Sequence, residues 1–211
     1  MTAESLEIGR LLRAATTGCV IGCKVSQIDL PSFGGLVRIP LDRRYQVFGL
    51  IYDIHIDDDG LVRQLVTAPN VPDDVIRDNR ENRNVPVEIS VLFTGYEQDD
   101  RVFHLLPPRP PLTLDAIYPC AAADLVRFTG AGRFGYFRHI LRAVDIPVPE
   151  LLAAHVLQAS QAHTACGDPA WTARAAQELI ALLRDDYPAL MAVLGSLSDS
   201  NLLNEEVQPH E

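Results

Sequence analysis

Three glycines in the stretch TGAGRFG match the spacing of a dinucleotide-binding turn. Gly130, Gly132 and Gly135 form the pattern G-x-G-x-x-G, in which glycines let the backbone approach a pyrophosphate at the start of a helix. The pattern works only where a parallel strand enters the turn and further strand–helix–strand units follow. Residues 136–211 contain no second or third strand pattern. We therefore interpret the stretch as a flexible linker between helices and keep nucleotide-cofactor binding as an alternative.

A cluster of basic residues surrounds the same glycines, with no acidic residue between Asp124 and Asp145. Helical spacing places Arg138 and Arg142 on one face, next to two aromatic residues. Such a face could contact an anion or a nucleic acid. The simpler interpretation, which we favour, is an amphipathic helix whose arginines balance the acidic residues of the chain. The cluster consists of Arg127, Arg133, Arg138, His139 and Arg142.

The cysteines and histidines do not show the spacing of a metal site. Cys19 and Cys23 point to the same side of an expected strand but lie about 13 Å apart along it, which is too far for one metal ion. His155, His163 and Cys166 have suitable side chains, but a helical spacing of eight separates the two histidines. The sequence contains no recognised nucleophile or zinc-protease motif. It therefore predicts no metal, no cofactor and no catalytic residues.

The composition limits the classes of partner. The chain has 28 acidic and 18 basic residues and a net charge of −10, which disfavours a polyanion as the sole partner. Nucleic acid is expected to be contacted only indirectly. The sequence has neither a secretory signal pattern nor an apolar window long enough for a membrane segment. We expect a cytoplasmic protein whose four cysteines stay reduced.

Alternating apolar residues predict β-strands in the first half of the chain. Cys19, Ile21, Cys23 and Val25 share one face of the first strand. The dipeptide Asp59-Gly60 favours a tight hairpin turn between two strands. Further strands are expected at residues 36–39, 45–56, 61–66, 87–96 and 102–106. The strand at 45–56 should be buried on both sides at its start. In the strand at 87–96, the side chains expected to face inward are Val87, Ile89, Val91 and Phe93, and those expected to face outward are Glu88, Ser90 and Thr94.

Periods of three and four residues predict helices elsewhere. A weak pattern of leucines suggests a short helix over residues 3–14, and residues 72–83 have the proline, acids and arginines of an exposed helix. The prolines at 107–111 cannot donate ladder hydrogen bonds and are expected to end the sheet. The chain should be helical beyond residue 115, its longest segment running from Asp168 to Leu197 with a stripe of Trp171, Ala175, Leu179, Leu182 and Leu183. Strands followed by helices indicate an α+β fold.

Several segments of the first half resemble, in order and spacing, the HAS-barrel, the small barrel shared by HerA-type DNA translocases and ATP synthase subunits. The resemblance covers residues 17–118 and implies a small closed, antiparallel-rich β-barrel. It divides the chain into an N-terminal segment (1–16), the barrel (17–118), an all-α C-terminal region (119–198) and a disordered tail (199–211). The segments are GCVIG, LVRIP, VFGLIYDI, DNRENRNVPVEISVLFTGY and HLLPPRPPL.

In HerA-type proteins the barrel precedes an ATPase motor, helps subunits form a ring and docks a partner nuclease. A motor needs a glycine-rich loop that ends in Gly-Lys-Ser/Thr, whereas the only lysine here is Lys24. We therefore expect a non-catalytic module for protein assembly, with a protein partner or a second copy of itself. Nucleic-acid association through residues 127–142 and nucleotide binding at Gly130–Gly135 remain alternatives.

Overall fold

The computed structural model describes residues 6–23, 31–56, 60–82 and 87–200. The strands are β1 (Gly9–Ala14), β2 (Gly18–Cys23), β3 (Leu36–Pro40), β4 (Tyr45–Ile56), β5 (Val87–Gln98), β6 (Arg101–Phe103) and β7 (Ala116–Pro119). The helices are α1 (Leu61–Thr67), α2 (Asp73–Asn82), α3 (Ala122–Gly130), α4 (Phe137–Leu141), α5 (Val148–Ala165), α6 (Trp171–Leu183) and α7 (Tyr187–Asp199).

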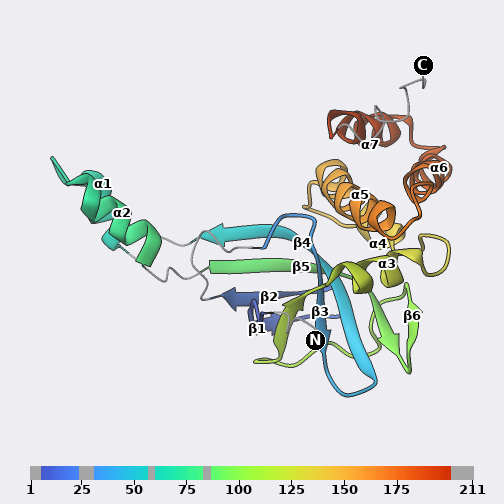
Figure 1. Cartoon of the computed structure of the whole chain (residues 1–211), viewed down its shortest axis with the longest axis horizontal. Coiled ribbons are helices and arrows are strands. Elements are labelled where there is room, and N and C mark those ends of the chain that lie inside the picture. The colour runs from blue at the N-terminus through green and yellow to red at the C-terminus, as the bar shows by residue number, and fades with distance from the viewer. Residues whose placement is uncertain (1–5, 24–30, 57–59, 83–86, 201–211) are drawn as a thin grey trace.

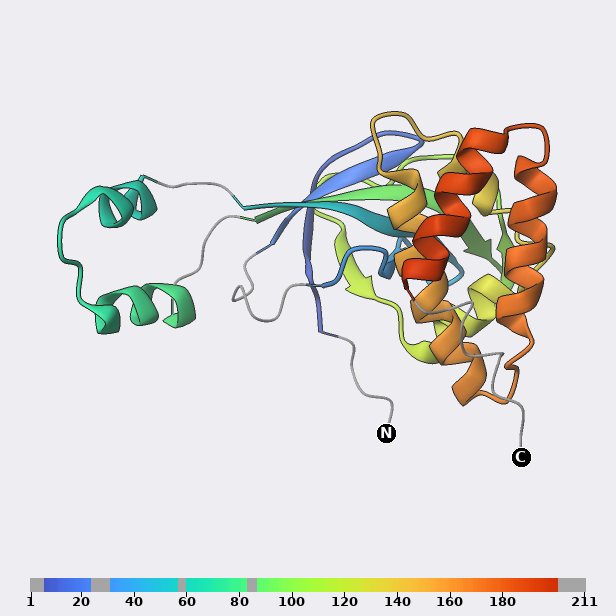
Figure 2. The ribbon, with the colours of Figure 1, turned by 90° about the horizontal axis from the view of Figure 1, so that it is seen from above.

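Six of these strands close into an antiparallel barrel. Hydrogen-bonded neighbours follow the order β2-β1-β7-β3-β4-β5, and β2 also pairs with β5, which joins the two ends. β6 pairs with the last residues of β5, outside this ring. Helices α3 to α7 follow the barrel and lie together at one end of the molecule (Figures 1 and 2). The α+β fold with a closed antiparallel barrel and a helical C-terminal region is thus confirmed.

The predicted inward faces of the strands form the interior of the barrel. Cys19, Ile21 and Cys23 are buried there, while Val25 lies outside the described residues. The Cys23 thiol donates a hydrogen bond to the carbonyl oxygen of Ile8 at 2.9 Å. Burial raises the pKa of Cys19 to about 12, so this thiol stays protonated and serves as a core residue.

β4 is buried on both faces over residues 47–51 and becomes partly exposed towards its end, in line with its sequence. Val47 and Ile51 pack inside the barrel, whereas Phe48 and Leu50 belong to the core under the helices. On β5, where Thr94 was predicted to face outward, its side chain is fully buried. The pairing of β4 with β5 skips Thr94, and such a bulge redirects the side chain that it displaces.

The helices share one hydrophobic core with the outer face of the barrel. Leu36, Phe48, Leu50 and Leu92 contribute from the strands. The barrel and the helical region are therefore joined by continuous apolar packing. The helices contribute Phe128, Tyr136, Phe137, Ile140, Leu151, Leu152, Ala153, Val156, Ala159, Trp171, Ala175, Leu179, Leu183, Val193 and Leu197. In the predicted stripe of α6 only Leu182 departs, since it is 38% exposed.

Strand β1 replaces the helix predicted over residues 3–14. It pairs with β2 on one side and with β7 on the other, so the sheet begins at Gly9, within the segment expected to precede the barrel. Among the leucines of the weak helical pattern only Leu11 is buried, and Leu6 is 74% exposed. Closure removes two unpaired strand edges, and this non-local gain outweighs a weak local preference.

Helix α1 replaces the strand predicted at residues 61–66. Gly60 has a φ of +82°, the conformation for which a glycine was expected, but the chain then enters a helix; Asp59 lies outside the described residues. The antiparallel partner of β4 is β5, with Ile56 opposite Val87. Apolar residues in LVRQLV also recur four residues apart, which suits a helix equally well.

Strand β7 shows that the sheet does not end at the prolines of residues 107–111. The prediction was wrong because a proline segment only interrupts pairing, and the chain then returns to place β7 between β1 and β3. The strand predicted at 102–106 is shorter, since β6 ends at Phe103. The helical region correspondingly starts at Ala122 rather than near residue 115.

The last predicted helical segment consists of two helices. The side chain of Asp186 accepts a hydrogen bond from the backbone N–H of Ala189 at 3.1 Å, and Pro188 lies in the first turn of α7. This cap and proline start a new helix after α6. The helix predicted at 72–83 is confirmed as α2. The tail from residue 201 onward lies outside the described residues.

Helices α1 and α2 form an arm inserted between β4 and β5. In Figures 1 and 2 the arm lies beyond the ends of these strands, on the side of the barrel opposite the helical region. The side chains from Asp73 to Asp78 are all exposed. In α1, Val66 is 78% exposed and Leu65 is half-buried. The arm thus presents apolar side chains to solvent.

We expect Gly49→Ala to lower the free energy of unfolding by about 1–3 kcal/mol. A Cβ at this position would lie 2.8 Å from the backbone oxygen of Leu92, which cannot move without disturbing the pairing of β4 and β5. Chemical denaturation measures the change. The matched control is Gly195→Ala in α7, where no described atom lies within 4 Å of the new Cβ, so helix propensity should stabilise the protein by up to ~1 kcal/mol. Equal stabilities of the two variants would contradict the prediction.

Candidate functional site

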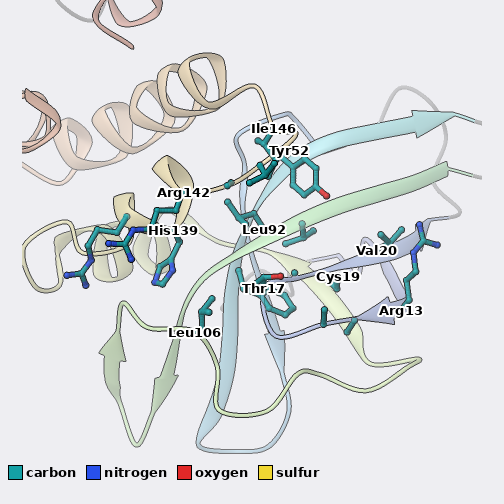
Figure 3. Close-up of a pocket in the computed structure, with 18 residues that line it drawn as sticks. Arg13, Thr17, Cys19, Val20, Tyr52, Leu92, Leu106, His139, Arg142 and Ile146 are labelled. Atoms are coloured by element: carbon teal, nitrogen blue, oxygen red, sulfur yellow. The ribbon is translucent and has the colours of Figure 1, made fainter. Parts of the chain in front are cut away.

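A pocket of about 700 Å³ opens between the barrel and α4 (Figure 3). Its walls are mainly apolar and come from the β1–β2 turn, from β4 and β5, and from the α4–α5 connection. Tyr52 and Leu92 contribute from the strands, and Val144 and Ile146 from the connection. Val144 is 80% exposed, so the pocket has an apolar lip as well as an apolar wall.

Two arginines lie at one end of this pocket. Arg138 is in α4 and Arg142 caps its C-terminus, one turn later, as their spacing predicts. The Arg138 Nε donates a hydrogen bond to the carbonyl oxygen of Gly135 at 3.2 Å. Within the described part of the chain, no carboxylate lies within ion-pair distance of either guanidinium. This end therefore carries positive charge that the described fold does not neutralise.

His139 lies between the two arginines and lines the same pocket. Its Nε2 is 3.1 Å from the carbonyl oxygen of His104, and since a carbonyl only accepts, Nε2 carries the proton. Burial lowers the pKa of His139, and the positive charges of Arg138 and Arg142 lower it further. The imidazole is therefore neutral at pH 7, and the charge at this end belongs to the arginines.

The opposite end of the pocket is marked by Arg13 of β1 (Figure 3). Its Nη2 lies 3.3 Å from a carboxylate oxygen of Glu88. Both side chains are exposed, so the pair contributes at most ~1 kcal/mol and leaves Arg13 able to reorient. The pocket thus has an apolar middle and basic ends, an arrangement suited to an amphipathic occupant that carries acidic groups.

The three glycines of the G-x-G-x-x-G pattern lie outside this pocket's lining. Gly130 ends a helix rather than following a strand, so the strand-to-helix turn that holds a pyrophosphate is not formed there. Gly132 has a φ of +59°, and a Cβ on Gly135 would lie 3.2 Å from the Cβ of His104. The glycines let the α3–α4 connection turn closely over His104, and the connection packs there instead of being a free linker.

The structure divides the basic cluster predicted from the sequence. Arg127 in α3 forms an ion pair with Glu97, which is 6% exposed, and another with Asp124 at 3.3 Å. Gln46 donates a second hydrogen bond to Glu97 at 2.8 Å. Arg127 therefore neutralises a buried carboxylate. Arg133 is exposed in the α3–α4 connection, so only Arg138, His139 and Arg142 of the cluster reach the pocket.

His155 is fully buried in α5 and is held by two hydrogen bonds. Nδ1 lies 3.3 Å from the carbonyl oxygen of Gly34, and Nε2 lies 3.2 Å from the hydroxyl of Tyr136. The carbonyl requires a proton on Nδ1, so Nε2 accepts from Tyr136. Burial lowers the pKa of His155 to about 4 and raises that of Tyr136 well above its usual range. The imidazole of His155 therefore stays neutral and the hydroxyl of Tyr136 keeps its proton, as the hydrogen bond between them requires.

His163 is also a buried residue of α5 and has structural partners of its own. Nε2 lies 2.8 Å from the hydroxyl of Thr129, and the ring stacks on Trp171 with centroids 4.6 Å apart. Cys166, by contrast, is exposed. Within the described ranges no group of three or more His, Cys, Asp or Glu side chains is arranged to hold a metal ion. The structure accordingly does not bring these three residues into one site.

The sequence indicated the basic end of the pocket but not the pocket itself. Arg13 was placed in a predicted helix, and Tyr52 and Val144 carried no local signal. Only the pairing of β1 with β2 and the path of the α4–α5 connection bring these side chains together. Local periodicity in a sequence does not reveal contacts between residues that are far apart in the chain.

The structure defines a small closed antiparallel barrel with helices packed on its outer face, a pocket that has basic residues at both ends, and a helical arm between β4 and β5. No family model and no curated protein matches the chain. Among the described helices, none combines the length and apolar character needed to cross a membrane.

Proposed function

We propose that this protein is a non-catalytic module for protein assembly, and that it binds its partner through the α1–α2 arm. The single observation that carries the proposal is the exposure of the arm. Val66 is 78%, Val75 37% and Ile76 43% exposed, on helices that lie away from both the barrel and the helical region (Figure 1).

The length of the helices supports this proposal. Helices α1 and α2 span 7 and 10 residues, and isolated helices shorter than about 12 residues are marginal in water because nucleation is costly. Their stability ordinarily comes from packing an apolar face against another surface. For the arm, that surface would be supplied by another protein subunit.

The barrel and the histidines are consistent with the same role. The resemblance of residues 17–118 to the HAS-barrel favours assembly, since barrels of that family hold subunits together and dock a partner nuclease. A separately encoded HerA-type translocase or its nuclease is thus a candidate partner. The histidines His104, His139, His155 and His163 each bind a backbone carbonyl or a hydroxyl, which suits structural roles.

Replacing residues 57–86 by Asn-Gly tests the proposal. Ile56 and Val87 are direct antiparallel partners, so a two-residue turn can join β4 to β5 without changing the register of the barrel. We expect the armless variant to keep the unfolding free energy of the full chain within about 1 kcal/mol. We also expect it to lose assembly, measured by light scattering for self-association and by affinity capture from source cells for other partners.

The control for folding is circular dichroism and denaturation of both proteins. If the full chain neither self-associates nor captures a protein that the armless variant fails to capture, the proposal is wrong. Arm-dependent assembly of either kind supports it.

A further inference from the structure

We propose that the arm of one copy docks into the pocket of a second copy, with α2 seated between Arg13 and Arg142. The inference rests on the proposed function and names its partner. It makes the contact heterologous, because the arm and the pocket are different surfaces, so repetition of the contact produces either a closed ring or an open chain of subunits.

The apolar face of α2 fits the middle of the pocket. Pro72, Val75 and Ile76 recur at three and four residues and therefore lie on one side of the helix. All three are exposed. The pocket, at about 700 Å³, falls within the ~300–1,000 Å³ of sites that enclose a drug-sized apolar group. An open, apolar-walled groove of this size can receive one helix face in the helix-in-groove mode.

The charges of α2 complement the ends of the pocket. Asp73 and Asp74 lie in the first turn of α2, and both are exposed. The pocket offers Arg138 and Arg142, without a described carboxylate within ion-pair distance, at one end, and the exposed Arg13 at the other. The acidic first turn of α2 would meet one basic end of the groove while its apolar residues enter the middle, which fixes the orientation of docking.

The arm of the same chain does not fill this pocket, since no described residue of α1 or α2 lines it. In the same chain the arm lies beyond the ends of β4 and β5, on the opposite side of the barrel from α4 (Figures 1 and 2). Of the arginines that rim the pocket, Arg138 lies in α4 and Arg142 at its C-cap, whereas Arg13 lies in β1. A second copy supplies the required acidic and apolar helix at the same concentration as the pocket.

Mixing two single-site variants tests this inference. Ile76→Arg damages the arm and Arg142→Glu damages the pocket, and both positions are exposed, so each variant should fold. We expect each alone to self-associate at least about tenfold more weakly than the full chain in sedimentation equilibrium, the change that ~1.4 kcal/mol produces. An equimolar mixture should form a heterodimer, because one copy keeps an intact arm and the other an intact pocket.

Arg133→Glu is the matched control. Arg133 belongs to the same basic cluster and is exposed but does not line the pocket, so self-association should be unchanged. A monomeric full chain, or self-association that survives Arg142→Glu, would overturn the inference. In either case, arm-dependent capture of a different protein would leave the proposed function intact. If the full chain is monomeric and no protein is captured through the arm, both the proposed function and this inference are wrong.

Discussion

The Trp171→Ala variant is expected to lose about 3–5 kcal/mol of unfolding free energy. Trp171 is 1% exposed. Its ring stacks on His163, lies 5.6 Å from the ring of Phe134, and its indole N–H donates to the carbonyl oxygen of Thr129 at 3.5 Å. Alanine would leave a cavity between these groups and remove the partner of a buried carbonyl, so the transfer and cavity costs add.

The same variant tests whether the barrel and the helices unfold together. Trp171 belongs to the cluster that also contains Phe48, Leu50 and Leu92 of the barrel. Removing the Trp171 side chain from this cluster should therefore lower the stability of the strands as well as that of the helices. Unfolding should remain a single transition, measured by circular dichroism and by tyrosine fluorescence. Two separate transitions, with the barrel unaffected, would show that the helical region is an independent domain.

Ile180→Ala is the control for the tryptophan variant. Ile180 lies in the same helix, α6, and is 44% exposed. Truncation there removes few buried contacts and leaves no enclosed cavity, so the change in unfolding free energy should stay near ~0.5 kcal/mol. A cost for Ile180→Ala as large as that for Trp171→Ala would contradict the prediction, because alanine is the better helix former and the loss would have to come from packing at a partly exposed position.

Acidification is expected to destabilise the protein by about 3 kcal/mol through His155 alone. Burial lowers the pKa of this fully buried imidazole to about 4 from an unperturbed value of 6.5. Between these values the unfolded chain binds a proton that the folded protein does not. The contribution of His155 is therefore fully present above pH 6.5 and is lost progressively as the pH falls towards 4.

The expected slope makes the measurement specific. One proton taken up on unfolding lowers stability by about 1.4 kcal/mol per pH unit between pH 6 and 5, above the range in which most carboxylates titrate. Burial also lowers the pKa values of His104, His139 and His163, so the total slope should be steeper. Urea denaturation at pH 7.0, 6.0, 5.5 and 5.0 gives the slope, and NMR titration of the His155 ring identifies its share.

Two results would contradict this prediction. A stability that stays level from pH 7 to pH 5 would mean that the buried histidines do not resist protonation. A His155 ring that titrates near pH 6.5 in the folded protein would mean that burial does not hold it neutral. Protonation of Nε2 would cost the hydrogen bond that Tyr136 donates, so the two readouts should change together.

Local patterns in the sequence determined much of the architecture. The period-two faces at Cys19–Cys23 and Tyr45–Ile56 were sufficient to identify strands of the barrel and their inward residues, because a strand with a buried face must alternate. Proline and acidic residues identified the start of α2, and apolar periods of three and four identified the helical region. These features depend only on residues close in the chain, so they can be read without the fold.

The tertiary structure decided what depends on residues far apart in the chain. Gly9–Ala14 forms a strand because β2 and β7 lie on either side of it, and Ala116–Pro119 returns to the sheet because β1 and β3 leave a place for it. The same non-local contacts assign Arg127 to a buried carboxylate and Arg142 to a pocket. Barrel closure lowers the free energy of the whole ring of strands at once, and this stabilisation cannot be predicted from any short segment of the sequence.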